Sequence, residues 1–457
     1  MQVSPVQLSI EALVDLEHPS EVQRSPNGEY VVFVLGRANR VDKDSTYEKT
    51  IHLIEMATRE VRALTPPHTG TNNQPCWSPD GTQIAYLTNC DDYDEMQLYA
   101  MDLDGGRRAT NAQALTDLRG KVDAPKWSKD MLSIAFLYNG TLDPEKYAEP
   151  DPIVLDANPR FNRVWILDLD TGDLRAVTPP DQHVFEYDWS PDGAALAVLL
   201  HPHPNPYQGW YSAQLYTVDL ASGMLYQVCT MKHQIGRLTW SPDSTQIAFV
   251  SGVMSDEGNV SGEVYTVPAS GGEPKSITPG IDHSITWIEW RDDGIAYGGR
   301  QIEDAVLGMI QPESEARRLI SKGMFSINGY GEQRVHAGRD GKFVAVRSSF
   351  NEPANIYMGS LESGAWTSLT ELSPDLPPLQ VENKYWRGAD GTAVHGYVVY
   401  PPGYTPGKRY PLFVHVHGGP SWSYVPSYGS IWDRLLTARG CVVLLPNPRG
   451  SWGRGHG

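Results

Sequence analysis

A sevenfold repeat runs through most of the chain and limits the folds it can adopt. Successive copies lie about 50 residues apart, a period typical of propeller blades when the content is strand-like. The copies contain VQRSPNGEYVVFVL at Val22, PCWSPDGTQIAYLT at Pro75, PKWSKDMLSIAFLY at Pro125, YDWSPDGAALAVLL at Tyr187, LTWSPDSTQIAFVS at Leu238, IEWRDDGIAYGG at Ile288 and VHAGRDGKFVAVRS at Val335.

Each copy predicts four antiparallel strands. The first strand ends at Trp-Ser, and Pro-Asp-Gly then makes a tight turn because proline fixes φ and glycine accepts a positive φ. The second strand carries a recurrent alanine, which indicates close packing of neighbouring blades (Ala85, Ala135, Ala197, Ala248, Ala296, Ala345). We expect an all-β seven-bladed propeller over residues 22–372, after an N-terminal segment at residues 1–21. No strand is left over, so the ring should close by side-to-side packing.

The alternating direction of the strands also predicts on which face of the ring each loop lies. The Pro-Asp-Gly turns should lie on one face of the ring, and the longer second-to-third loops on the other. Those loops are Gly36–Thr50, Asn139–Arg163, His201–Ala213 and Gly252–Gly262. Variable loops on a rigid scaffold often carry function, and we expect this face to meet residues 380–457.

After a linker at residues 373–379, the pattern changes to that of an α/β domain. Two segments that alternate like paired strands come first, at Gln380–Arg387 and Ala393–Tyr400. An apolar strand at Leu412–His417 then leads into His-Gly-Gly-Pro. A helix at Trp432–Arg439 should end at Gly440, and a buried strand at Cys441–Leu445 leads into Asn-Pro-Arg-Gly-Ser. The two glycines of the first motif allow bare backbone to approach a ligand.

The order and spacing of these two motifs closely resemble the start of the catalytic domain in the prolyl oligopeptidase family of serine peptidases, especially its acylaminoacyl-peptidase and dipeptidyl-peptidase-like branches. The resemblance covers the whole chain. It implies a propeller that restricts access, an incomplete α/β-hydrolase domain at residues 380–457, and hydrolysis of short peptides through a Ser-His-Asp acyl-enzyme mechanism without a cofactor. It also implies that Gly419, with Gly418 as the alternative, supplies an oxyanion-hole N–H.

The chain departs from the family pattern at the nucleophile. The family's serine lies in G-x-S-x-G at a strand–helix elbow, and none of the 457 residues forms that motif. Family order places Ser, Asp and His beyond Gly457, so no catalytic triad residue is assigned and the 457-residue chain is predicted to be inactive. The alternative interpretation is a non-catalytic propeller module that binds a protein or peptide.

Other candidate residues have an ordinary structural explanation beside the functional one. Arg160 or Arg163 is a candidate to take a peptide carboxylate or acyl oxygen, although solvated arginines are commoner. Trp210 and Tyr211 are candidates to contact substrate, or aromatic residues folded over the blade. A second set has the same ambiguity: Arg449 either holds the active-site loop or forms an ion pair, and His415 and His417 share one strand face but have no further ligand nearby. No metal site is therefore predicted.

Charge and cysteine content indicate which partners and which cellular compartment to expect. A net charge of -18 argues against a nucleic-acid or anionic-membrane partner. Residues 1–20 contain no lysine, arginine or long apolar core, which is unlike a signal peptide. Four scattered cysteines (Cys76, Cys90, Cys229, Cys441) indicate reduced thiols in a cytoplasmic protein. The sequence does not indicate an oligomeric state.

Overall fold

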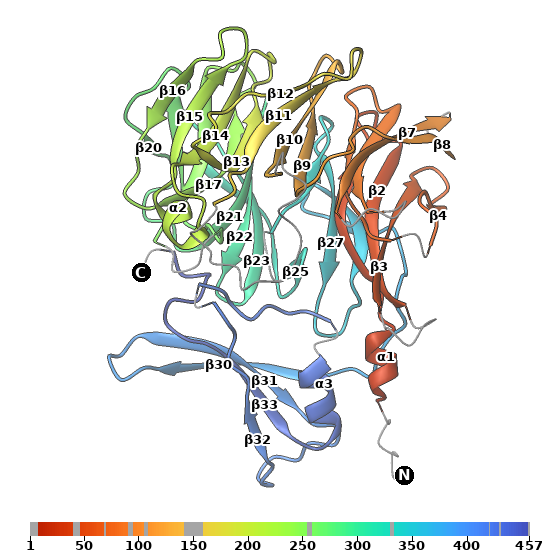
Figure 1. Cartoon of the computed structure of the whole chain (residues 1–457). Helices are drawn as coiled ribbons and strands as arrows, with labels where there is room; N and C mark the ends of the chain where they lie inside the picture. Colours follow the sequence, from red (N-terminus) through yellow and green to blue (C-terminus); the bar gives the residue numbers. More distant parts are fainter. Residues whose placement is uncertain are drawn as a thin grey trace.

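The computed structural model is nearly all β, with three short helices among the residues that it describes (Figure 1). Those residues are 8–39, 46–67, 70–89, 95–104, 108–140, 159–253, 258–329, 333–419, 421–428 and 431–455. Cys90, Pro420 and parts of the loops at 36–50, 139–163 and 252–262 lie outside them.

Seven antiparallel sheets follow one another along the chain, each made of strands that are consecutive in sequence. The first three sheets contain β1 (His18–Arg24), β2 (Tyr30–Asn39), β3 (Thr46–Glu55), β4 (Val61–Ala63), β5 (Asn72–Trp77), β6 (Gln83–Thr88), β7 (Gln97–Asp104), β8 (Arg108–Ala114), β9 (Val122–Trp127), β10 (Ser133–Tyr138), β11 (Arg163–Asp168) and β12 (Leu174–Ala176). The next three contain β13 (His183–Trp189), β14 (Ala195–His201), β15 (Gln214–Asp219), β16 (Leu225–Cys229), β17 (Gln234–Trp240), β18 (Gln246–Gly252), β19 (Glu263–Pro268), β20 (Lys275–Ser276), β21 (Ser284–Arg291), β22 (Gly294–Gln301), β23 (Asp304–Ile310) and β24 (Arg317–Gly323).

The seventh sheet differs from the predicted four-stranded pattern because it has five strands. They are β25 (Ser326–Ile327), β26 (His336–Ala337), β27 (Lys342–Ser348), β28 (Asn355–Ser360) and β29 (Trp366–Ser368). Both β25 and β26 pair with β27, so the predicted first strand is split into two short pieces. At the other end of the series, β1 starts at His18, ahead of the expected boundary at Val22.

The repeated motif residues have the structural roles that the sequence predicts. Ser78 Oγ donates to Asp80 Oδ1 at 2.6 Å, and the same carboxylate accepts the Thr82 N–H at 3.0 Å. The same Ser–Asp bond recurs at Ser128, Ser190 and Ser241. The repeated aspartate therefore holds a turn. All six recurrent alanines are fully buried.

The repeated tryptophans join neighbouring sheets. Trp127 Nε1 donates to the Cys76 carbonyl of the preceding sheet at 3.2 Å, and Trp240 Nε1 donates to the Asp188 carbonyl at 3.3 Å. Three of these tryptophans, at 77, 127 and 240, are less than a tenth exposed. They pack between sheets and do not form an exposed stacking row.

A β-bulge in the first strand of most sheets was not predicted. The bulge places Gln74, Ala124 and Arg237 at positive φ, and its freed N–H groups need acceptors. Side chains of the preceding sheet supply them: Gln74 Oε1 accepts the Ala124 N–H at 2.7 Å, and Glu186 Oε2 accepts the Arg237 N–H at 2.8 Å. These bulges thus link the second sheet to the third and the fourth sheet to the fifth.

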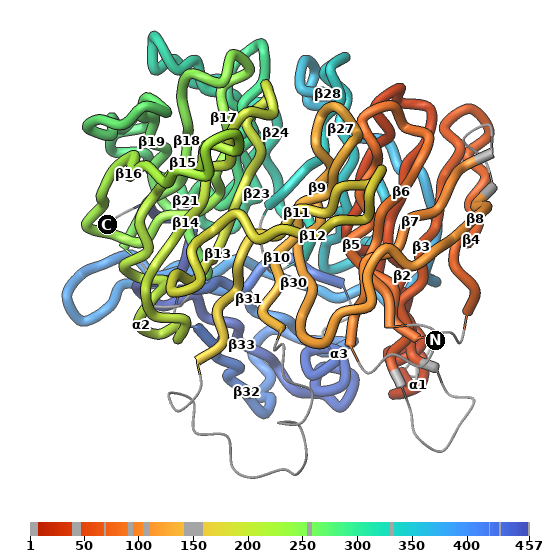
Figure 2. Tube along the Cα trace, turned by 45° about the horizontal axis from the view of Figure 1, so that its top comes forward, coloured from red at the N-terminus to blue at the C-terminus, as the bar shows by residue number. Residues whose placement is uncertain are grey.

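Hydrophobic clusters lie between every pair of successive sheets, and one of them joins the first sheet to the seventh. In that last cluster Val31 and Phe33 pack with Val344 and Ile356. Figure 2 shows the two sheets side by side, and β1 contacts β27. Among the described strands, none of the first sheet is hydrogen-bonded into the seventh, so side chains make the contact in this cluster.

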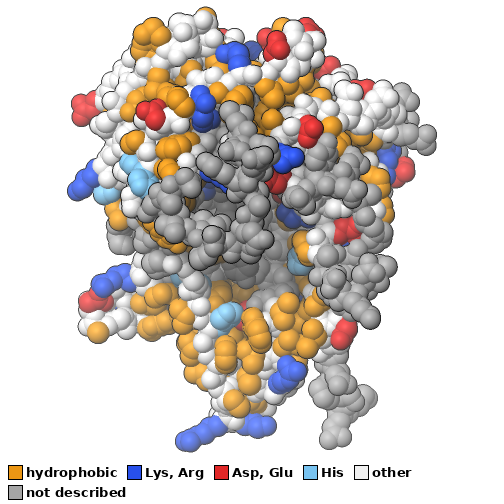
Figure 3. Space-filling view, in the orientation of Figure 1, with side chains coloured by type: hydrophobic (Ala, Val, Ile, Leu, Met, Phe, Trp, Pro, Cys, Tyr) orange, Lys and Arg blue, Asp and Glu red, His pale blue; other side chains and the backbone are white. Residues whose placement is uncertain are grey.

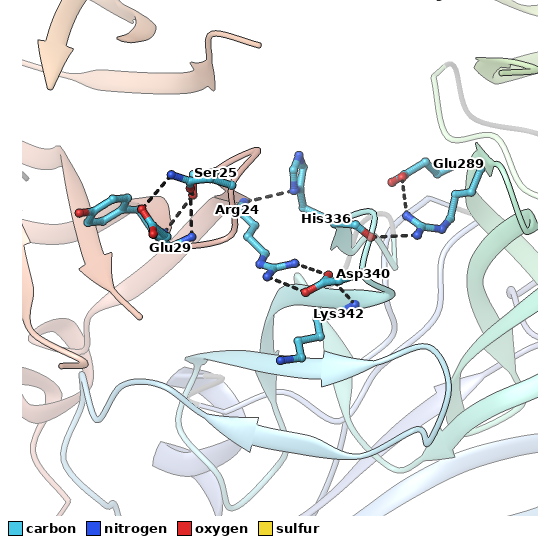
Figure 4. A network of polar contacts seen from close by, with 11 residues as sticks. Arg24, Ser25, Glu29, Glu289, His336, Asp340 and Lys342 are labelled. Atoms are coloured by element: carbon cyan, nitrogen blue, oxygen red, sulfur yellow. Dashed lines mark hydrogen bonds and ion pairs between the residues drawn. The ribbon is translucent and has the colours of Figure 1, made fainter. Parts of the chain in front are cut away.

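Polar groups complete this seam (Figure 4). The two terminal nitrogens of Arg24 donate to both carboxylate oxygens of Asp340 at 2.5 and 2.9 Å, and the Arg24 N–H donates to His336 Nδ1 at 3.1 Å. Arg291 of the sixth sheet donates to the Gly338 carbonyl at 2.9 Å. The side chain of Arg24 is only 9% exposed, so its charge has a fixed partner at the seam.

The C-terminal part forms a separate mixed sheet in the order β30-β31-β33-β32. Its strands are β30 (Gln380–Arg387), β31 (Ala393–Tyr400), β32 (Leu412–Val414) and β33 (Val442–Asn447). Helix α3 (Ile431–Ala438) connects β32 to β33, which are parallel, and Gly440 at φ 87° follows it. Helix α1 (Ile10–Val14) packs against α3 through Leu13, Leu16 and Leu435. Within the described ranges, no helix is long and apolar enough to cross a membrane.

The C-terminal sheet meets the predicted face of the seven-sheet array. Tyr397 Oη of β31 donates to the Glu303 carbonyl at 3.2 Å, and Asn351 Nδ2 donates to the Leu379 carbonyl at 3.0 Å. Glu303 and Asn351 lie in second-to-third connections, so the facing prediction is confirmed there. Helix α2 (Pro206–Ser212), in the predicted loop His201–Ala213, lies on this side of the sheets in Figure 1.

Four histidines predict acid sensitivity. Burial away from water disfavours the charged imidazole and lowers the pKa from 6.5 to about 4 at four positions: His52, His183, His336 and His395. Between about pH 6.5 and pH 4, these histidines are protonated in the unfolded chain but not in the folded one. The free energy of unfolding therefore falls as pH falls through this range, by about 1.36 kcal/mol per pH unit for each histidine. Urea unfolding at pH 7, 6 and 5 should show this loss. His52→Gln should reduce the slope, whereas a stability that is constant across this range would contradict the prediction.

Candidate active site

The two sequence motifs meet at one edge of the C-terminal sheet. Strands β32 and β33 are parallel neighbours, with Phe413 opposite Val443. The segments that leave their carboxyl ends therefore emerge at the same edge, where ligands bind in open α/β sheets. This topology brings His417-Gly418-Gly419 beside Pro448–Ser451.

Hydrogen bonds join the two motifs directly. His417 Nε2 lies 2.8 Å from Ser451 Oγ, and the Trp452 N–H donates to the Trp422 carbonyl at 3.1 Å. Asn447 Oδ1 accepts the Tyr424 N–H at 2.7 Å, and Asn447 Nδ2 donates to the Tyr424 carbonyl at 3.2 Å. The sequence gives no sign of these bonds, because they depend on side-chain direction.

The two glycines differ in what the backbone requires of them. Gly419 has φ 122°, a conformation that L side chains rarely adopt, so glycine is required there by the turn. A Cβ placed on Gly418 would meet nothing within 4 Å. The turn alone therefore explains Gly419 but not Gly418. Both residues are exposed, and open space beside their shared peptide is available to a ligand.

The hydrogen bond between His417 and Ser451 does not make a nucleophilic pair. His417 Nδ1 lies 2.6 Å from the Gly418 carbonyl, so Nδ1 donates to a neutral acceptor and has no carboxylate behind it. Ser451 is only 7% exposed. A buried hydroxyl cannot be approached by a substrate carbonyl, so this bond holds the two motifs together.

His415 and Arg449 have structural partners. His415 Nδ1 lies 3.2 Å from Oδ1 of the buried Asp433 on α3, and the Tyr424 ring packs 5.5 Å from the His415 ring. Arg449 pairs with Asp390 in the turn between β30 and β31. Hydrogen bonds from Thr392, together with the Arg449 charge, lower the pKa of Asp390. Among the described side chains, no three His, Cys, Asp or Glu residues are grouped to hold a metal ion.

The predicted substrate-binding residues lie on the third and fourth sheets. Arg163 Nε donates to the Thr178 carbonyl at 2.9 Å, and its guanidinium lies over the Trp165 ring, which favours a structural role. Arg160 is exposed. On α2, Trp210 is half-buried 4.8 Å from the Phe185 ring, and Tyr211 is half-buried beside it. Substrate contact by these residues stays a prediction.

A buried arginine fastens α3 to the rest of the molecule, which the sequence did not indicate. Arg434 is 1% exposed. Its terminal nitrogens donate to the Pro377 carbonyl of the linker at 2.9 Å and to the Phe350 carbonyl of the seventh sheet at 2.7 Å. The Tyr428 ring lies 4.5 Å from its guanidinium carbon. One side chain thus ties the helix behind the motifs to both neighbouring segments.

Arg434→Met should lower the free energy of unfolding by about 2–5 kcal/mol, because two carbonyl groups lose their buried donor. Urea unfolding measures this change, and proteolysis at residues 373–379 should become faster. Arg439→Met is the matched control, since Arg439 is exposed on the turn that follows the same helix. Equal stability of the two variants would show that Arg434 does not fasten the helix.

Known proteins are similar to this chain in sequence. No protein-family model matches the chain. The dipeptidyl-peptidase 5 of Porphyromonas gingivalis is 24% identical, in a match that covers 98% of this chain and 69% of that protein. The dipeptidyl-peptidase 5 of Aspergillus oryzae is 25% identical over 61% of this chain and 40% of its own length. The chain therefore corresponds to only part of each relative.

Solved structures match over almost the whole chain at low identity. Pyrococcus horikoshii acylaminoacyl peptidase superposes with a TM-score of 0.73 and 17% identity, covering 97% of this chain and 67% of that one. A puromycin-hydrolyzing peptidase of Mycobacterium tuberculosis gives 0.74 and 18%, covering 99% and 69%. An acylaminoacyl peptidase bound to Z-Gly-Gly-Phe-chloromethyl ketone gives 0.74 and 17%, covering 97% and 67%. The fold is thus shared with peptidases that are longer than this chain.

Proposed function

Similarity in sequence to dipeptidyl-peptidase 5 proteins, and in fold to acylaminoacyl peptidase, supports assigning the chain to the prolyl oligopeptidase family of peptidases, and from this premise we propose that the protein is a serine peptidase of short peptides. The reaction proceeds through an acyl-enzyme formed by a Ser-His-Asp triad. The Gly418–Gly419 peptide supplies one oxyanion donor, the Gly419 N–H. A cytoplasmic location stays a prediction.

The joining of the two motifs is the observation that carries this proposal. His417 and Ser451 hold the glycine loop against the segment after β33, at 2.8 Å. An oxyanion donor must be fixed before charge develops on the substrate, because reorganisation would cost part of its effect. A loop that is hydrogen-bonded to its neighbour, and that leaves both glycines exposed, meets this requirement.

The triad is proposed to lie outside the 457 residues. None of them forms G-x-S-x-G, and Ser451 is buried with its hydroxyl bonded to His417. The apolar side chains of Leu412, Val414 and Val416 are 49–61% exposed on and after β32, and Figure 3 shows hydrophobic side chains gathered over the C-terminal sheet. An apolar surface of this kind supports a sheet that further strands extend.

The seven sheets are proposed to form a propeller that restricts access. The clusters between successive sheets, and the cluster between the first and the seventh, support a ring. A cavity of about 670 Å³ lies where the first strands of the first three sheets meet Asn328, Arg334 and Val335. Its charged lining is mixed: Glu21, Asp123, Lys126, Asp188 and Arg334. A cavity of this size has room for a short peptide but not for a folded protein.

Expression of the protein with the codons that follow Gly457 tests the proposal. The expected product carries a G-x-S-x-G serine and cleaves chromogenic dipeptide or acylamino-acid amides, and alanine at that serine abolishes cleavage. A stop codon directly after Gly457, or an extended protein that cleaves no peptide, would favour the alternative of a non-catalytic binding module.

A further inference from the structure

Residues 451–455 form a bridge between the glycine loop and the sixth sheet. This bridging segment begins at Ser451, the last residue of the second motif. On one side it contacts His417 through Ser451. On the other side the Gly453 N–H donates to Ser284 Oγ at 2.8 Å, and the Ile302 N–H donates to the Gly453 carbonyl at 2.8 Å.

The bridging segment is connected to the proposed oxyanion donor, the Gly419 N–H, through the Gly418–Gly419 peptide. Because His417 Nδ1 donates to the Gly418 carbonyl at 2.6 Å, that carbonyl cannot rotate freely. The Gly418–Gly419 peptide is planar and trans, so its carbonyl and the Gly419 N–H point in opposite directions. Fixing the carbonyl therefore fixes the direction of the N–H. Ser451 in turn fixes the His417 ring at Nε2.

The segment is closely packed where it meets the sixth sheet. Ser284 is 3% exposed in β21. Ile302, in the turn between β22 and β23, has φ 57°, which is rare for a β-branched residue. A Cβ on Gly453 would lie 2.7 Å from the Ile302 nitrogen. Backbone strain that the surrounding contacts maintain is often found near functional sites.

We infer that Ser284 and the Ile302 turn are positioning residues that align the Gly419 N–H from the sixth sheet, through Gly453, Ser451 and His417. The inference rests on the proposed function, since the donor is the one assigned there. It gives the sixth sheet a part in turnover beyond restricting access. A substrate would not contact Ser284 or Ile302, so their effect falls on kcat and not on substrate binding.

Hydrogen–deuterium exchange on the 457-residue chain tests the alignment without any catalysis. Ser284→Ala removes the acceptor of the Gly453 N–H, and exchange in a peptide covering residues 412–419 should accelerate. Ser451→Ala removes the contact with His417 at the other end of the bridging segment, and should accelerate exchange in the same peptide. Ser326→Ala is the matched control, because Ser326 is fully buried and bonded to Ser348 in the seventh sheet. Equal exchange in Ser284→Ala, Ser326→Ala and the unmodified chain would overturn the inference.

Kinetics of the extended protein provide the second measurement. Ser284→Ala and Ser451→Ala should each lower kcat about tenfold with KM unchanged, the scale of one misaligned neutral hydrogen bond. The double variant should lose little more than either single one, because both break one path. A changed KM with normal kcat, or fully multiplicative losses, would contradict the inference. An unmodified extended protein that lacks activity would refute the proposed function, while the exchange experiment would still decide the alignment.

Discussion

A fluorophosphonate probe should leave the 457-residue chain unlabelled, and should label a chain extended through the complete catalytic domain at one site per molecule. The probe reacts with a serine whose hydroxyl is activated by a neighbouring base and open to solvent. Ser451 is 7% exposed, and the histidine it contacts faces the Gly418 carbonyl where a triad would have a carboxylate. Loss of a complete triad lowers turnover by about 10⁶-fold.

Intact-mass measurement after incubation gives the stoichiometry for both proteins. Ser451→Ala in the shorter chain is the control for slow adventitious labelling. Stoichiometric reaction of the shorter chain, lost in Ser451→Ala, would show that Ser451 is a nucleophile and that the interpretation of its hydrogen bond is wrong.

Replacing the Gly419 amide with an ester should lower turnover of the extended enzyme by about 10²–10³-fold, the typical cost of one lost oxyanion donor. The ester keeps the side-chain-free backbone and the positive φ of 122° at this position, but it has no N–H. KM should change little, since the donor acts on the charge of the transition state. Kinetics on the semisynthetic enzyme measure the effect.

Gly418 offers the internal comparison. The same ester at Gly418 removes the other candidate N–H in the same loop. A larger loss there than at Gly419 would move the donor by one residue, whereas near-normal turnover in both folded variants would show that the loop supplies no oxyanion donor.

The sheets were predictable from the sequence because each repeat carries its own local signals. The hairpin of β30 and β31 has the predicted residues, and Trp-Ser-Pro-Asp-Gly or a variant of it marks each first strand and its turn. The bulges at Gln74 and Ala124 were not predictable, since a positive φ at glutamine or alanine is stabilised by an acceptor from another sheet. The split of the seventh sheet's first strand into β25 and β26 likewise has no local marker.

At the candidate site, the motifs predicted the glycines but not what holds them. Gly418 and Gly419 follow from the His-Gly-Gly-Pro pattern. The contacts of Ser451 with His417 and of Gly453 with Ser284 join residues far apart in sequence, and Arg434 is an unremarkable helix residue until its two carbonyl partners are known. Such pairings require the three-dimensional arrangement, because no periodicity or spacing encodes them.

The residues of α1 cannot pack on α3 until α3 has been synthesised. Leu13 and Leu16 are synthesised long before their partner Leu435. At a synthesis rate of about 5–20 residues per second, the early residues wait roughly 20 seconds or more. The same holds for Val31, whose neighbour Val344 belongs to the seventh sheet. The sheet made first on the ribosome is therefore the last to gain both neighbours, and until then its apolar side chains are available to chaperones or to other nascent chains.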